Sequence, residues 1–204
     1  LDRPKSANWT TATVQKTGAG AEMLLLQSGM GIHAVNPKNG EVAWHYADGA
    51  STIPSSTLAG GVLYVPSHGL TALELADDGR SFKQKWRSSR LRPDTASPLV
   101  HRDRVYSLNS AGVLTCGDTD SGKRLWQLRL DGPFGGSPVV ADNHLYAFNE
   151  EGKAQVVDLS APEGRIAGEM DLGEMIQCSP AVSNGALYVR SNGRIWKIAR
   201  KTQL

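Results

Sequence analysis

Short apolar runs alternate with polar turns along the whole chain, and the clearest example spans residues 137–152. Ser137–Ala141 and Leu145–Asn149 have the length and composition of β-strands, and the polar pair Asp142-Asn143 between them favours a tight turn. A second turn follows at Glu150-Glu151-Gly152. The pattern predicts a β-hairpin that leads directly into further strands.

The hairpin recurs at a regular spacing. A serine followed nine residues later by a tyrosine occurs four times, and the serines are 42, 40 and 42 residues apart. Each unit has room for four short strands, and Gly, Pro or Asn-Gly interrupts every candidate helix within about ten residues. A period of this length with four strands per unit is typical of β-propeller blades. The repeated pairs are Ser55 and Tyr64, Ser97 and Tyr106, Ser137 and Tyr146, and Ser179 and Tyr188.

We therefore predict an all-β fold, a β-propeller of four-stranded antiparallel blades that forms a single domain over residues 1–204. About five repeats are present, four of them complete and the last lacking its fourth strand. Trp44, Trp86 and Trp126 each fall on a predicted fourth strand, where a large ring can dock one blade on the next. In the fourth repeat Glu169 or Met170 lies near the tryptophan position. The blades span roughly residues 9–47, 53–88, 95–131, 135–172 and 177–200.

Composition and charge exclude some classes of function but do not identify one. The formal net charge is +2 and the basic residues are scattered, which argues against a nucleic-acid surface. No stretch approaches the roughly 18 consecutive apolar residues of a membrane helix. Cys116 and Cys178 fall in different repeats, and we expect two free, partly buried thiols rather than a disulfide.

Catalytic and metal-binding patterns are weak. The five histidines have irregular spacings without the paired ligands that a metal site needs. The repeated serines occur in every unit, as expected of a structural residue, whereas a nucleophile would be singular. Acidic residues at Asp77-Asp78, Asp118 and Asp120 lie in predicted turns, and we expect them to fix turn geometry.

Two segments carry a family resemblance. Ala34-Val35-Asn36-Pro37-Lys38-Asn39-Gly40-Glu41-Val42-Ala43-Trp44 and Cys116-Gly117-Asp118-Thr119-Asp120-Ser121-Gly122-Lys123-Arg124-Leu125-Trp126 resemble the repeat of pyrroloquinoline-quinone (PQQ) propellers. The resemblance extends over essentially the whole chain. It implies an eight-bladed ring, of which this chain is the C-terminal half or more, and export to the periplasm or the extracellular space. The chain begins with Leu1 and shows no leader, so we expect a processed or truncated piece. A ring of only five blades, completed by residues 1–8, is the alternative.

The resemblance covers two functional classes. Quinoprotein dehydrogenases bind PQQ and calcium, whereas the outer-membrane assembly lipoprotein and similar exported proteins use the propeller without a cofactor. The sequence lacks the adjacent cysteine pair usual beside the quinone, and no acid matches the catalytic position. We therefore expect a non-catalytic scaffold without cofactor or metal, closer to the assembly lipoprotein. A fragment of a PQQ- and calcium-dependent alcohol or sugar dehydrogenase is the alternative.

The loops that enter each blade differ most among the repeats. Variable loops on a rigid scaffold commonly carry binding specificity, so we expect a protein partner or an unidentified ligand to bind there. Self-association through open blade edges is a further expectation, since unpaired strands at the ends of an arc can pair with another chain. The candidate surface residues are Arg90, Arg92, Asp94, Phe134 and Met175.

Overall fold

The computed structural model describes residues 5–200, and this part of the chain is built from strands and turns alone. The strands form five antiparallel sheets, four with four strands and the last with three, as the sequence predicted. Residues 5–200 contain no helix long and apolar enough to cross a membrane. The strands are β1 (Thr13–Lys16), β2 (Glu22–Ser28), β3 (Gly31–Val35) and β4 (Val42–Tyr46) in blade 1; β5 (Thr57–Ala59), β6 (Val62–Val65), β7 (Leu70–Leu75) and β8 (Phe82–Ser88) in blade 2; β9 (Leu99–His101), β10 (Arg104–Leu108), β11 (Val113–Asp118) and β12 (Arg124–Arg129) in blade 3; β13 (Val139–Ala141), β14 (His144–Phe148), β15 (Lys153–Asp158) and β16 (Arg165–Asp171) in blade 4; and β17 (Ala181–Ser183), β18 (Ala186–Arg190) and β19 (Ile195–Ala199) in blade 5.

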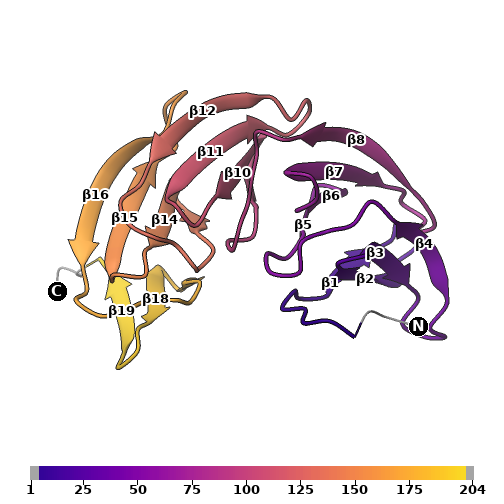
Figure 1. The fold of residues 1–204 in the computed structure, drawn as a ribbon, viewed down its shortest axis with the longest axis horizontal. Helices are drawn as coiled ribbons and strands as arrows, with labels where there is room; N and C mark the ends of the chain where they lie inside the picture. Colours follow the sequence, from indigo (N-terminus) through magenta and orange to yellow (C-terminus); the bar gives the residue numbers. More distant parts are fainter. Residues whose placement is uncertain (1–4, 201–204) are drawn as a thin grey trace.

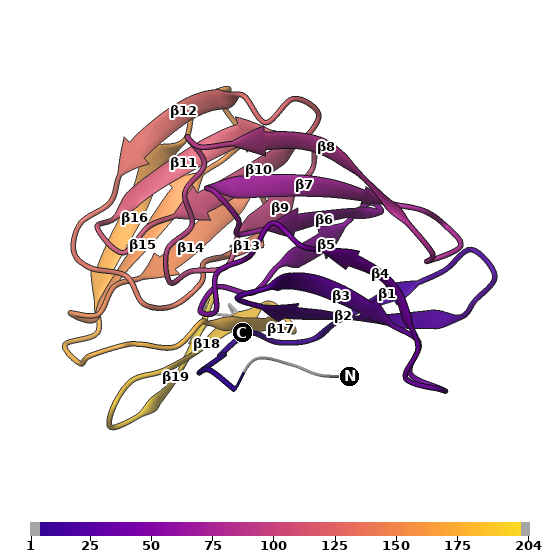
Figure 2. The ribbon, with the colours of Figure 1, turned by 45° about the vertical axis from the view of Figure 1, so that its right-hand side comes forward.

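The five sheets stand side by side in an open arc (Figures 1 and 2). Each complete blade is a meander in which sequence neighbours pair, and its fourth strand, β4, β8, β12 or β16, lies on the outer rim of the arc (Figure 1). This arrangement is the β-propeller expected from the repeat. A twisted sheet of this size buries its two faces only against other sheets, which is why the blades stack.

The repeated serines connect one blade to the next. The backbone N–H of Ser55 donates to Oγ of Ser97 at 3.0 Å, that of Ser97 donates to Oγ of Ser137 at 2.9 Å, and that of Ser137 donates to Oγ of Ser179 at 2.9 Å. Blade 1 joins the series through Thr11, whose N–H donates to Oγ of Ser55 at 2.9 Å. Each serine hydroxyl thus satisfies a backbone donor beside the first strand of the preceding blade, which explains its recurrence.

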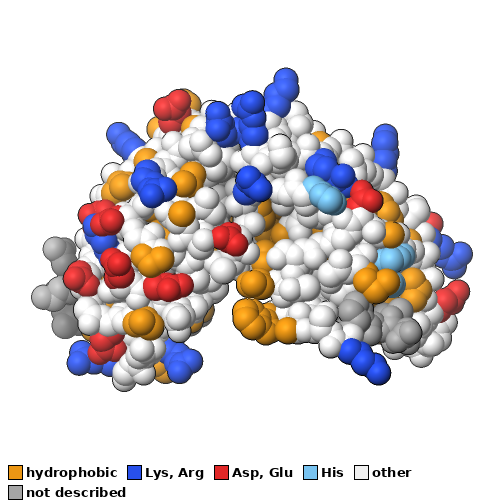
Figure 3. Space-filling model, viewed as in Figure 1, with side chains coloured by type: hydrophobic (Ala, Val, Ile, Leu, Met, Phe, Trp, Pro, Cys, Tyr) orange, Lys and Arg blue, Asp and Glu red, His pale blue; other side chains and the backbone are white. Residues whose placement is uncertain are grey.

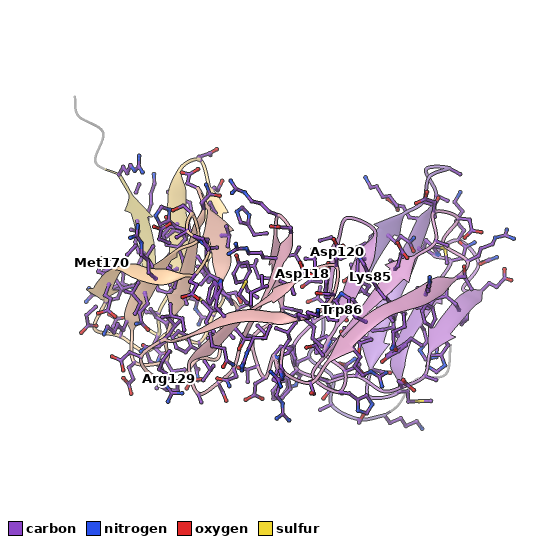
Figure 4. All side chains as sticks on the ribbon, turned by 90° about the horizontal axis from the view of Figure 1, so that it is seen from above. Lys85, Trp86, Asp118, Asp120, Arg129 and Met170 are labelled. Atoms are coloured by element: carbon purple, nitrogen blue, oxygen red, sulfur yellow. The ribbon has the colours of Figure 1, made fainter. Side chains whose placement is uncertain are left out.

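The fourth-strand tryptophans pack against the following blade. The indole N–H of Trp86 donates to the carbonyl of Thr119 at 2.8 Å, and its ring covers Gly122 so closely that a Cβ there would lie 2.5 Å from a ring carbon. Trp126 covers Gly164 in the same way, with a corresponding distance of 2.4 Å. Figure 4 shows Trp86 at the junction with blade 3, together with the Lys85–Asp120 ion pair of 2.6 Å.

Trp44 makes the corresponding contact between blades 1 and 2, where its ring centroid lies 4.8 Å from that of Phe82. All three tryptophans are buried. The hydrophobic clusters accordingly extend across the junctions rather than within single sheets. The cluster between blades 3 and 4, for example, combines Tyr106, Leu114 and Trp126 with Leu145 and Val157.

Strand register identifies the residue at the tryptophan position in blade 4. In blades 1 to 3 the tryptophan pairs with Ala34, Ala72 or Cys116, and the residue just before the tryptophan is the unpaired residue of a β-bulge in the fourth strand. In blade 4 the residue after the same bulge is Gly168, and its partner is Val156. The sequence-based assignment near Glu169 or Met170 is therefore corrected to Gly168, which follows Gly164 by four residues, as Trp44 follows Gly40 and Trp126 follows Gly122. Met170 lies farther along β16, near one end of the arc, whereas Trp86 lies near its middle (Figure 4).

Blade 5 stops at its third strand within the described part of the chain. β19 pairs with β18 only, and residues 5–8, which the five-bladed alternative places beside β19, form no strand. Residues 1–4 of that alternative lie outside the described residues. The arc is open between blades 1 and 5 (Figure 1), so residues 5–200 do not form a closed five-bladed ring.

Candidate functional site

The loops between blades lie on one face of the propeller. In a four-stranded meander the turn between the second and third strands and the exit from the fourth strand lie at the same end of the sheet. Hydrogen bonds confirm this placement, since the loop before each of blades 2, 4 and 5 bonds to the second turn of the same blade. The donors and acceptors are Ser51 N–H to Pro66 O at 2.8 Å, Glu150 N–H to Pro133 O at 2.8 Å, and Asn192 N–H to Met175 O at 3.1 Å. We call this surface the loop face.

The loop between β8 and β9 carries three of the sequence-predicted surface residues. Arg90, Arg92 and Asp94 are all exposed. The Asp94 carboxylate accepts a hydrogen bond from the Ser110 hydroxyl in the turn after β10, which anchors the loop. Arg90 and Arg92 have neither a hydrogen-bonding nor an ion-pair partner among residues 5–200, so both guanidinium groups face solvent with their donors available.

Phe134 is not part of this surface. Its side chain is 1% exposed and belongs to the hydrophobic cluster between blades 3 and 4. Its carbonyl accepts a hydrogen bond from Thr95 at 2.9 Å, and its N–H donates to Ser110 O at 3.0 Å. Phe134 therefore anchors the loop before blade 4, because burial of its ring outweighs any tendency of a loop residue to face water. Met175, in the loop before blade 5, is 48% exposed.

A hollow of about 410 Å³ lies on the loop face where blades 1 and 2 meet. Its wall is formed by the loop after β4, the turn between β6 and β7, and Arg92 with Pro93. Among these segments Asp48 and His68 supply polar side chains. The hollow therefore brings Arg92 together with polar groups of the two preceding loops.

A hydrogen-bond network fixes the edge of this hollow. Nη2 of Arg87 donates to the Asp48 carboxylate and, at 3.0 Å, to the Tyr46 hydroxyl. The Tyr46 hydroxyl also lies 3.1 Å from Oγ of Ser67, and both groups are buried. The hydrogen bond to Asp48, more than any other contact, raises the pKa of Arg87. The network makes this part of the loop face rigid and leaves Arg92 as the unpaired cation beside it.

His68 has a backbone conformation that few side chains adopt. Its φ is 50°, in the left-handed region, and its Nε2 lies 3.0 Å from the carbonyl of Asp48. Non-glycine residues adopt this region only where their surroundings compensate the strain, and such residues are enriched at functional sites. The network around Asp48 and His68 was not predicted from the sequence. Two of its members come soon after a docking tryptophan in the sequence, since Tyr46 follows Trp44 and Arg87 follows Trp86. Nothing in the sequence shows that their side chains contact each other.

The acidic residues of the turns lie away from the loop face, and their carboxylates accept hydrogen bonds or form ion pairs. Asp118 accepts hydrogen bonds from the N–H and hydroxyl of Ser121, at 2.7 and 2.5 Å, and these bonds lower its pKa. Asp120 pairs with Lys85 across the junction. No three His, Cys, Asp or Glu residues gather as a possible metal site in the part of the chain that the structure describes.

Comparison with known proteins gives the family. Two overlapping stretches, residues 78–167 and 110–203, match the PQQ repeat family described as "Outer membrane protein assembly factor BamB". Together they span more than half of the chain. The chain belongs to this family. The resemblance seen in the sequence, to PQQ-like propellers and within them to the outer-membrane assembly lipoprotein, is thereby confirmed.

Two individual proteins extend the comparison. The outer membrane protein assembly factor BamB of Salmonella typhimurium is 31% identical over 98 residues, which cover 43% of this chain and 24% of that protein. The crystal structure of BamB from Moraxella catarrhalis matches with a TM-score of 0.72 at 18% identity, covering 89% of this chain and 56% of that one. The second likeness concerns the fold alone. The chain spans about a quarter of the curated relative and about half of the solved structure.

Proposed function

We propose that this chain is part of a non-catalytic scaffold of the cell envelope, located in the periplasm, that binds a protein involved in outer-membrane assembly through its loop face. The observation that carries the proposal is the pair Arg90 and Arg92, two exposed guanidinium groups without partners on a loop whose backbone is anchored. Arginine is enriched among residues that dominate protein–protein binding, and a rigid loop loses little conformational entropy on binding. Family membership supports the role in assembly.

The remaining loop-face residues fit the same interpretation. Met175 provides an exposed apolar contact, and Asp94 and Asp48 provide acidic groups beside the arginines. Basic side chains also lie along the outer rim of the arc, and apolar side chains gather at its inner edge (Figure 3). Mixed charge with a few apolar contacts is the usual composition of a non-obligate protein interface.

The proposal is tested with charge reversals on opposite faces. Arg90→Glu with Arg92→Glu changes the loop face, and Lys38→Glu with Lys123→Glu changes the turns before the fourth strands on the opposite face. Each pair is introduced into the full-length protein in a strain that lacks its own copy, and outer-membrane barrel proteins are quantified. We expect only the loop-face pair to lower their amount, and a photo-crosslinker at position 92 to capture an assembly protein about tenfold less efficiently in the Arg90→Glu background, equivalent to ~1.4 kcal/mol. Equal behaviour of the two pairs would refute the proposal.

A further inference from the structure

A groove of about 860 Å³ separates blade 4 from blade 5 on the face opposite the loop face. Blade 4 contributes Tyr146, Val156 and Gly168, and blade 5 contributes Val182, Leu187 and Ile198. The turns between the first and second strands of both blades also line it, which places it away from the loop face. The groove is therefore separate from the surface proposed above.

The other blades show what this position normally holds. In blades 2 and 3 a tryptophan lies beside a tyrosine of the second strand, with ring centroids 5.8 Å apart for Tyr64 and Trp86 and 5.9 Å apart for Tyr106 and Trp126. Those tyrosines are 3% and 1% exposed. Tyr146 has the same register as its counterparts but is only partly buried, because Gly168 stands where an indole would cover it.

The space above Gly168 is open. A Cβ built on Gly168 would meet nothing within 4 Å, whereas one on Gly164 or Gly122 would strike the ring of a docked tryptophan. The groove thus has the tyrosine and the aliphatic lining of a tryptophan site without the tryptophan. Within residues 5–200, no side chain fills it.

The charged side chains at the groove indicate which residues of an occupant would flank its aromatic ring. Lys197 and Arg200 both line it, are exposed, and have no hydrogen-bonding or ion-pair partner among the described residues. Asp142 is the one acidic side chain in the lining. An occupant with carboxylates beside its aromatic ring would meet a net positive rim, and unpaired cations at an interface select such partners.

We propose that the groove between blades 4 and 5 is a docking site for an extended segment of a partner protein that inserts a large aromatic side chain over Gly168, with acidic residues next to it facing Lys197 and Arg200. The aromatic ring occupies the position that Trp86 and Trp126 hold at the other junctions and contacts Tyr146. An aromatic anchor in a preformed pocket is a common basis of peptide recognition.

The direct test is a titration of the full-length protein with a fluorescein-labelled peptide of alternating threonine and aspartate around one central tryptophan. We expect saturable binding that weakens at least tenfold when alanine replaces the tryptophan or lysine replaces the aspartates. Gly168→Trp should abolish binding and raise the melting temperature, because the added indole fills the groove. Lys197→Glu with Arg200→Glu should weaken binding at least tenfold without changing the fold.

Several results would overturn the proposal. These are the absence of saturable binding, unchanged binding by Gly168→Trp, and a lower melting temperature of that variant. Binding that appears only after removal of residues 201–204 would show that this segment, not a partner, occupies the groove. A dimer that is seen in analytical sedimentation and that the peptide dissociates would indicate that a second copy of the chain occupies the groove. The loop-face pair Arg90→Glu and Arg92→Glu is the matched control, and it should leave peptide binding unchanged, so the two proposals can fail separately.

Discussion

At three junctions between blades the fourth strand supplies a tryptophan, and at the fourth junction it supplies Gly168 instead. At the junctions after blades 1, 2 and 3, an indole ring packs on the next blade, and in two of them it lies directly on a glycine of the following turn. Burial of one indole removes about 200 Å² of apolar surface from water, worth about 5 kcal/mol. At the junction after blade 4, Gly168 leaves a groove in the same place.

This difference between the junctions distinguishes positions that stabilise the fold from positions that are available for binding. Residues that recur in several blades, such as the serines and tryptophans, are accounted for by contacts between neighbouring blades. Where a blade departs from the repeat, it exposes surface that makes no contact with a neighbouring blade. The loop before blade 3 with its unpaired arginines and the groove at Gly168 are both of this kind.

The largest expected effect comes from emptying a filled junction. Trp126→Ala removes the ring from between blades 3 and 4 and should lower the free energy of unfolding by about 3–5 kcal/mol, since a large cavity remains. The measurement is urea denaturation followed by circular dichroism. Trp9→Ala is the matched control, because Trp9 is 73% exposed, and equal shifts of the two midpoints would show that the junction contributes little.

A pair of glycine substitutions compares the two kinds of junction directly. Gly164→Ala places a Cβ within 2.4 Å of the Trp126 ring and should destabilise by about 1–3 kcal/mol through overpacking. Gly168→Ala meets nothing within 4 Å and should instead stabilise by about 0.5–1 kcal/mol, because it lowers the entropy of the unfolded chain. Thermal unfolding of both variants measures the effects. Shifts of the same sign would contradict the assignment of Gly168 to an empty junction.

Acid should weaken the turn that receives Trp126. The Asp158 carboxylate accepts hydrogen bonds from the hydroxyl and N–H of Ser160 and pairs with Arg165 at 2.9 Å, and these contacts, Ser160 first, hold its pKa well below the usual range. A lowered pKa in the folded state means that the stabilisation is present above the unfolded pKa of about 3.9 and is lost as pH falls through the folded pKa.

The melting temperature should therefore fall more steeply below about pH 4 in the wild type than in Asp158→Asn. Asp142→Asn is the control, because the Asp142 carboxylate has no partner among residues 5–200 and its left-handed φ of 48° suits asparagine. If all three proteins respond alike to acid, the Asp158 contacts do not contribute to stability in solution.

The smallest effect concerns the two thiols, which report on the two kinds of junction. Cys116 pairs with Trp126 across the sheet and is buried, and burial raises its pKa to about 11. Cys178 packs at the junction of blades 4 and 5 and is partly exposed. Because the thiolate is the reactive form, iodoacetamide at pH 8 should modify Cys178 in the native protein and Cys116 only after unfolding. Peptide mapping of Cys178→Ser against the wild type checks this order.

The sequence alone determined the repeat and therefore the fold. Turn residues and short apolar runs specify strands locally, and the regular spacing of serine, tyrosine and tryptophan reflects contacts that recur between neighbouring blades. Five sheets, the last with three strands within residues 5–200, followed from this regularity, and the PQQ-like family followed from the resemblance of residues 34–44 and 116–126 to its repeat. Arg90, Arg92 and Asp94 are exposed, since variable polar loops seldom enter a core, and their role as a binding surface stays a prediction.

Tertiary structure decided what depends on register and on contacts between distant segments. Strand pairing places Gly168, not Glu169 or Met170, opposite Val156 at the tryptophan position, after the same bulge that precedes the tryptophans of the other blades. The Phe134 ring is buried because blades 3 and 4 together form the hydrophobic cluster in which it packs. The Asp48–Arg87 pair and the groove at Gly168 exist only where two blades meet, so no single stretch of sequence contains them.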